Sequence, residues 1–248
     1  MSSLFTYTLR IADSSLILGQ RMAEWCSKGP TLEEDIAMSN ISLDLFGQSN
    51  GFYEYAAQLD GSKSANKLAF RRNEREFFNH QLAEQENGNF GTTTVRNFLH
   101  DAFNLLFYTQ LSSSKDETLA ALAAKSLKEV KYHLRHSSNW LIRLGDGTNE
   151  SNARSQEALE LLWQYTGELF EMDEIDNELL NLGIGVDNTA LKTQWDEILN
   201  KTLKKAKLNR PEDGYMATGG KKGMHTEYLG FLLAEMQFLQ RAYPDAKW

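Results

Sequence analysis

Apolar side chains recur at steps of three and four residues along most of the chain, the spacing that places them on one face of a helix. Polar or glycine-containing clusters separate these stretches, and two stretches open with a capping-box spacing, at Thr31–Glu34 and Ser114–Glu117. Only three prolines occur in 248 residues. The pattern predicts an all-α fold. The expected helices span about 5–27, 31–59, 74–85, 92–111, 115–144, 150–170, 188–208 and 226–241.

The order of these helices predicts one bundle with an extension. No shift in composition, internal repeat or low-complexity segment marks a second domain. We predict a single domain over residues 1–248, with a core bundle at about 5–144 that contains four long helices. Further C-terminal helices are expected at about 150–241.

Composition narrows the classes of partner and compartment. The formal net charge of −8 argues against nucleic acid, because phosphate binding needs a basic face. No apolar run approaches the length of about 18 residues that a membrane-spanning helix needs, so no membrane partner is expected. One cysteine, Cys26, cannot form an internal disulfide, and its place on a helix predicts a small buried apolar role. With no secretory signal pattern at the N-terminus, we expect a cytoplasmic protein.

The helix at 115–144 carries the strongest hint of a metal site. Its predicted inward stripe consists of Ser126, Val130, His133, Ser137 and Trp140. Glu129 lies about 40° from His133 around the helix, so both side chains could meet one ion. Bundles that hold two irons use Glu-x-x-His pairs, and this chain has none. The positions three residues before its five histidines hold Phe77, Asn97, Val130, His133 and Lys222.

A second helix, at 31–59, could supply further ligands. Asp44 and Gln48 lie one turn apart there, but an amide stands where an iron site would need imidazole or carboxylate. We interpret Asp44, Gln48, Glu129 and His133 as candidates for a degenerate site, in which the polar groups satisfy one another. The sequence therefore predicts no metal-binding, cofactor-binding or catalytic residue on this chain.

Other polar clusters are predicted to be structural. Glu76, His80 and Glu84 form a row at four-residue steps that favours surface ion pairs. The adjacent His100 and Asp101 point about 100° apart on a helix and cannot easily share a ligand. The acidic stretch at 168–178 lacks the spacing of a calcium loop and predicts a solvated face.

The glycine-rich loop at 214–223 resembles a phosphate-binding loop only in composition. Its spacing departs from the nucleotide motif, because Gly220 intrudes and a helix precedes the loop. Lys221 and Lys222 in this loop remain candidates for contact with a partner or an anion.

Several sequence strings resemble the family of C subunits of phenylacetyl-CoA 1,2-epoxidase, and the resemblance covers nearly the whole chain. The strings lie at 6–10, 40–48, 87–90, 132–135, 144–145, 218–223 and 233–237. The resemblance implies a ferritin-like helical bundle and a non-catalytic structural subunit in aerobic phenylacetate degradation. It implies pairing with a catalytic A subunit that carries the di-iron centre, and also contact with the small B subunit. Flavin and an iron–sulfur cluster would belong to an NADPH-dependent reductase, and this chain would carry no cofactor.

Two other functions stay open on the sequence. A free-standing di-iron or di-manganese oxidase would use Glu129, His133 and a carboxylate such as Asp44. An acyl-CoA-binding or phosphate-binding protein would use Lys221, Lys222 and the lysine-rich helix around 201–207, although such lysines usually serve solubility. A hetero-oligomer is expected, and homodimerisation of the isolated chain is left open.

Overall fold

The computed structural model describes residues 2–61, 64–244 and 246, and within these residues it contains helices and no strand. The predicted all-α, ferritin-like helical architecture is confirmed. Contacts divide the chain into two compact units, residues 1–85 with 219–248 and residues 86–218, which are described separately below. No helix within the described ranges has the length and hydropathy that crossing a lipid bilayer requires.

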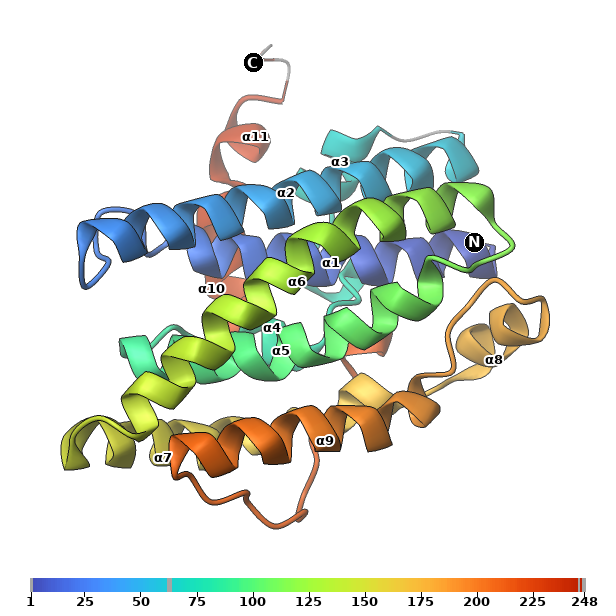
Figure 1. Ribbon diagram of the computed structural model, residues 1–248. Helices are drawn as coiled ribbons and strands as arrows, with labels where there is room; N and C mark the ends of the chain where they lie inside the picture. The colour runs from blue at the N-terminus through green and yellow to red at the C-terminus, as the bar shows by residue number, and fades with distance from the viewer. Residues whose placement is uncertain (1, 62–63, 245, 247–248) are drawn as a thin grey trace. The chain divides into compact units, whose positions relative to one another are not determined.

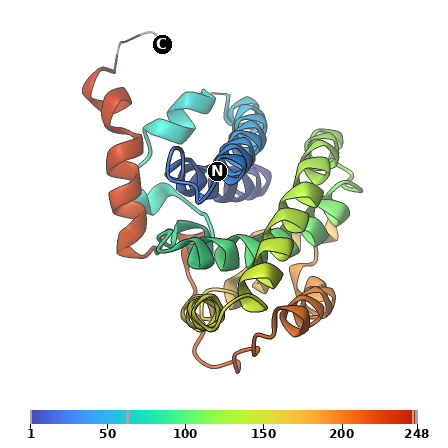
Figure 2. The ribbon, with the colours of Figure 1, turned by 60° about the vertical axis from the view of Figure 1, so that its left-hand side comes forward.

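The first unit is organised around a hairpin of two long helices, α1 and α2, which run side by side (Figures 1 and 2). Thr31 caps α2 through its side chain, as the predicted capping box requires, and Gly61 ends the helix in the left-handed conformation. The elements of this unit are α1 (Ser3–Ala23), α2 (Leu32–Asp60), α3 (Ala65–Phe70), η1 (Glu74–Glu76), α4 (Gln81–Glu84), η3 (Gly220–Lys222), α10 (Glu227–Met236) and α11 (Phe238–Ala242).

Close approach of α1 and α2 depends on small residues. Ser42 donates a hydrogen bond of 2.9 Å from Oγ to the carbonyl oxygen of Gly19. A Cβ atom at Gly19 would lie 3.1 Å from side-chain atoms of Leu45 and Phe46, tighter than ordinary packing. The absence of a side chain at Gly19 therefore lets α2 lie directly on α1.

The predicted helix at 74–85 is wrong over its middle. The chain forms a single 3₁₀ turn, then extended backbone, then the short α4. Distant side chains bind the backbone that a helix would use: the N–H of Phe78 donates to Asp13 Oδ2 at 2.8 Å, and that of His80 donates to Ser14 Oγ at 3.3 Å. These tertiary hydrogen bonds replace the local ones.

A short helix, α3, and a break near the C-terminus were also not predicted. The helix expected at 226–241 divides into α10 and α11 at Gln237. The buried Gln237 side chain donates from Nε2 to the carbonyl oxygens of Ala69 and Arg72, each at 3.1 Å. The Gln237 side chain thus ties the break between α10 and α11 to the end of α3.

The second unit contains the helical hairpin α5–α6, with α7 and α9 packed on α5 (Figure 1). Trp195 is fully buried and donates from Nε1 to the carbonyl oxygen of Leu99 at 3.1 Å, which fixes α9 against α5. A Cβ atom at Gly145 would overlap the backbone carbonyl of Ala206, so the end of α6 can meet α9 only at a glycine. The elements are α5 (Phe90–Leu111), α6 (Glu117–Gly145), α7 (Asn149–Trp163), η2 (Gly167–Phe170), α8 (Glu174–Asn181) and α9 (Asn188–Ala206).

The prediction of a solvated acidic face at 168–178 is only partly correct. Asp173 caps α8 by accepting hydrogen bonds from the N–H groups of Ile175 and Asp176, while Glu168 and Asp176 are buried. A carboxylate that caps a helix start satisfies backbone donors, which explains part of this acidic cluster without a bound cation. The single-domain organisation with its core at 5–144 stays a prediction.

Candidate functional site

The four residues of the predicted degenerate site lie in two pairs. Asp44 and Gln48 are one turn apart on α2 in the first unit, and Gln48 is buried while Asp44 is half-buried. Glu129 and His133 are one turn apart on α6 in the second unit, with Glu129 half-buried. His133 is 1% exposed, which confirms that it faces inward.

A buried carboxyl group from α5 is electrostatically coupled to His133. Asp101 accepts a 2.8 Å hydrogen bond from Ser137 Oγ, one turn beyond His133 on α6. Burial raises the pKa of Asp101 to about 6, and electrostatic interactions with His133, His136 and Arg96, together with the hydrogen bond from Ser137, oppose this effect only in part. Sequence reasoning treated Asp101 as structural. The only available signal was its place in α5, a helix whose other positions are mostly apolar or small.

His100, the neighbour of Asp101, is held in a separate environment. Asn104 Nδ2 lies 2.9 Å from His100 Nδ1, within one turn of α5. Burial and the positive charge of Arg96 lower the pKa of His100 to about 4, so the imidazole is neutral at pH 7. The prediction that His100 and Asp101 have separate partners agrees with their different hydrogen bonds.

The residues around His133 lack the ligand pattern of a di-iron pair. Ser137 Oγ donates its hydrogen bond to Asp101. Val130 occupies the position where a Glu-x-x-His pair needs its carboxylate. Among the described residues, no group of three or more His, Cys, Asp or Glu side chains is arranged to hold a metal ion. The donor set therefore does not fit two irons.

The first unit contains a buried ion pair that the sequence did not indicate. Arg72 binds both carboxylate oxygens of Asp13, with 3.0 Å between Nη1 and Oδ2 and a shorter contact between Nη2 and Oδ1. Tyr53 donates its hydroxyl to the same carboxylate at 2.5 Å. Burial and the charge of Asp13 raise the pKa of Tyr53 well above its ordinary value. Asp13 joins α1, α2 and the segment after α3, which is a structural role.

A second buried polar cluster surrounds Glu84 at the end of α4. Its Oε2 lies 2.8 Å from His225 Nδ1 and accepts from Asn79 Nδ2 at 2.9 Å, and its Oε1 accepts from the backbone N–H of Thr226 at 2.6 Å. His225 Nε2 lies 2.9 Å from the carbonyl oxygen of Phe77. Both ring nitrogens of His225 thus lie within hydrogen-bond distance of an oxygen atom, which fixes the orientation of the ring beside Glu84.

The Glu84 cluster corrects the prediction that Glu76, His80 and Glu84 make surface ion pairs. Glu84 is fully buried, whereas Glu76 is exposed and binds the backbone N–H of Asn73. The partner of Glu84 is 141 residues away in sequence, so helical spacing could not reveal it. The prediction for Cys26 is also wrong, because its thiol is exposed.

The two lysines of the glycine-rich loop differ in exposure. Lys221 is buried and its carbonyl oxygen accepts from Arg10 at 3.5 Å, whereas Lys222 is exposed. A Cβ atom at Gly223, which has a φ of 74°, would overlap the carbonyl of Arg75. Gly223 is therefore packed closely against Arg75 within the first unit. Partner or anion contact by Lys221 and Lys222 stays a prediction.

Comparison with known proteins identifies the family. Residues 1–248 match the family described as "Phenylacetic acid catabolic protein". The chain belongs to this family. A relative in Escherichia coli (strain K12), named as the C subunit of 1,2-phenylacetyl-CoA epoxidase, is 48% identical over 248 residues, and the match covers all of both chains. Membership in the phenylacetic acid catabolic protein family agrees with the resemblance found in the sequence strings.

Proposed function

We propose that this chain is the non-catalytic structural subunit of a multicomponent phenylacetyl-CoA 1,2-epoxidase in aerobic phenylacetate degradation. The observation that carries the proposal is the full-length match, at 48% identity, to a relative named as the C subunit of that epoxidase. The match covers both chains completely. The proposed place of action is the cytoplasm.

The donor set supports the non-catalytic part of the proposal. In α6, His133 stands without the carboxylate that a di-iron bundle places three residues before its histidine. In α2, Gln48 offers an amide, which binds iron poorly compared with carboxylate or imidazole. We propose that the di-iron centre belongs to the catalytic A subunit, and that flavin and an iron–sulfur cluster belong to the reductase. This chain would carry none of these cofactors.

The proposed partners are the A subunit and the small B subunit of the same complex. A structural partner acts by covering and positioning the catalytic bundle through a large interface. Exposed apolar side chains on α2, namely Leu32, Ile36 and Leu43, lie on one helical stripe and suit such a contact.

Reconstitution tests this function. The chain and a tagged A subunit are co-expressed and purified, and NADPH-dependent and O₂-dependent loss of phenylacetyl-CoA is measured after the reductase and B subunit are added. We expect co-purification, turnover by the complex, and no turnover by this chain with the reductase alone. Close to two metal ions per chain in the isolated protein, together with turnover, would replace the proposal with a free-standing oxidase.

The variant His133→Gln distinguishes a structural role of this chain from a catalytic one. His133→Gln removes the imidazole from the core of the second unit while keeping a polar side chain. We expect the assembled complex to retain nearly all of its turnover per A subunit. Loss of turnover at unchanged assembly would show that His133 takes part in the chemistry and would contradict the structural role.

A further inference from the structure

Two adjoining cavities lie in the first unit, and no part of the proposed function uses them. The smaller cavity, of about 360 Å³, lies between α1, α2, α3 and α10. Its apolar wall comes from Leu16, Phe46 and Met236, and its polar lining residues are uncharged. A volume of this size falls within the range of about 300–1,000 Å³ that is typical of small-molecule sites.

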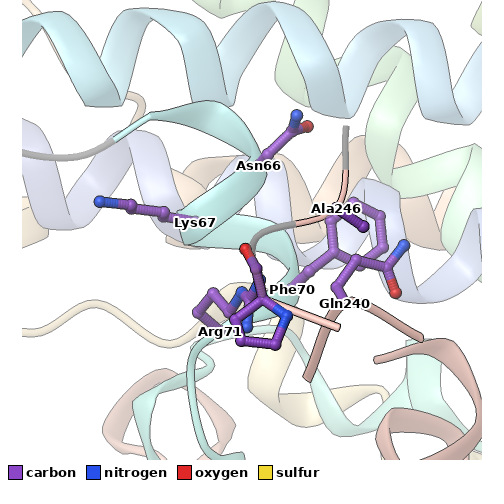
Figure 3. Close-up of a pocket in the computed structure, with 7 residues that line it drawn as sticks. Asn66, Lys67, Phe70, Arg71, Gln240 and Ala246 are labelled. Carbon is purple, nitrogen blue, oxygen red and sulfur yellow. The ribbon is translucent and has the colours of Figure 1, made fainter. Parts of the chain in front are cut away.

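The larger cavity, of about 660 Å³, lies between α3 and the chain around α11, and it has a basic edge. Arg71 and Lys67 line it, and no acidic side chain is among its described lining residues. Phe70 and Gln240 also line this cavity, and Figure 3 shows the side chain of Lys67 extending away from both. Arg71 is therefore the better placed of the two cations.

The two cavities are neighbours because two residues line both of them. These residues are Asn66 and Phe70, one turn apart on α3, and each lines both cavities. On the opposite side, Met236 lines the smaller cavity and Gln240, four residues later, lines the larger one. The lining thus changes in order from apolar side chains, to Phe70 and Gln240, to the guanidinium of Arg71.

Two polar side chains along these cavities, Gln240 and Arg71, can form further hydrogen bonds. Within the described part of the chain, the buried Oε1 of Gln240 receives no hydrogen bond. Arg71 uses one Nη2 contact, at 3.1 Å, to the carbonyl oxygen of Pro244, and a guanidinium has five N–H donors. The site therefore offers an apolar wall, then the acceptor of Gln240, then the cation of Arg71. A matching ligand has an apolar group, then a hydrogen-bond donor, then an acid.

We propose that these cavities form a binding site for an amphipathic organic acid. The apolar group occupies the smaller cavity against Phe46 and Met236, where its burial supplies most of the affinity. An amide N–H or hydroxyl of the ligand donates to Gln240. The carboxylate or phosphate of the ligand accepts hydrogen bonds from Arg71, whose fork of donors suits both groups.

Calorimetric titration of the full chain with N-octanoylglycine tests the proposal, because this probe contains an eight-carbon acyl chain, an amide and a carboxylate. We expect saturable binding of one molecule per chain. The uncharged N-octanoylglycinamide should bind about tenfold more weakly, since it lacks the charge-assisted bonds to Arg71. Octyl phosphate distinguishes a phosphate from a carboxylate as the preferred acid.

Variants locate the binding. Arg71→Gln should weaken the acid about tenfold and leave the uncharged amide unchanged, because only the acid uses the guanidinium. Ala65→Leu, which places a larger side chain in the smaller cavity, should abolish binding of both probes. Arg75→Gln removes an exposed cation outside the lining and should bind like the wild type.

The results decide the proposal either way. Arg71 and Ala65 are at or near the surface of a short helix, so their variants are expected to fold, and circular dichroism checks this. Absence of saturable binding, or binding that neither Arg71→Gln nor Ala65→Leu changes, would overturn the proposal. Equal affinity of the wild type for the acid and the uncharged amide would remove the role of Arg71.

Discussion

Replacing Asp101 by asparagine should stabilise the protein at neutral pH and do so less at acidic pH. Asp101 lies in the core of the second unit, where burial raises its pKa from 3.8 to about 6. The folded state therefore binds the proton of Asp101 more tightly than the unfolded state does. This tighter proton binding stabilises the folded state fully below about pH 3.8, and the stabilisation is lost as the pH rises through 6. The substituted amide would never ionise, and its oxygen could still accept from Ser137.

The size of the effect follows from the two pKa values. The difference between about 6 and 3.8 corresponds to about 3 kcal/mol of unfolding free energy, at 1.36 kcal/mol for each tenfold change in the dissociation constant. Integration of the difference in proton binding over pH shows that about 1.4 kcal/mol of this stabilisation is lost between pH 5 and pH 8. The free energy of unfolding of Asp101→Asn, relative to that of the wild type, should therefore rise by about 1.4 kcal/mol from pH 5 to pH 8.

Urea unfolding followed by circular dichroism at pH 5, 6, 7 and 8 measures this difference. Glu212→Gln, which neutralises an exposed carboxylate, controls for the change in net charge. A variant whose stability difference from the wild type is the same at pH 5 and pH 8 would refute the reasoning. In that case Asp101 would be stabilised as a carboxylate in the core.

Three further substitutions test the buried polar groups and one close approach, each by urea unfolding. Arg72→Met leaves the Asp13 carboxylate buried without its cation and should cost about 3–5 kcal/mol; a loss below about 1 kcal/mol would mean that water reaches Asp13. His225→Ala removes the partner of the buried Glu84 and should cost about 3 kcal/mol, most of it restored by adding Glu84→Gln, which leaves no carboxylate to bury. Gly145→Ala pushes α6 away from α9 and should cost about 1–3 kcal/mol, whereas unchanged stability would show that the helices separate freely.

Much of the helical structure could be predicted because it depends on local patterns. The side chains of Thr31 and Asp116 cap α2 and α6 close to the expected starts, and the inward stripe of α6 buries His133 as predicted. The segment at 77–80 could not be predicted, since its backbone is bound by Asp13 and Ser14, more than sixty residues earlier. Helical propensity depends only on neighbouring residues, so it cannot reveal such distant partners.

The candidate site divides in the same way. The missing Glu-x-x-His pairs are a property of the sequence, so the poor fit to two irons was visible without coordinates. The importance of Asp101 was not visible, because its raised pKa comes from burial against α6. Glu84 was assigned to the surface for a related reason: a charged row at four-residue steps looks solvated until its distant partner is known.

Sequence patterns were sufficient to predict the all-α class, most helix boundaries and the family, because hydrophobic period, capping residues and long shared strings are all local properties. Tertiary structure decided which charged groups are buried and how they are satisfied. Glu84 pairs with His225 and Asp13 pairs with Arg72 only when segments far apart in sequence are brought together. Burial of a charge depends on everything packed around it, and no spacing along one helix can specify that.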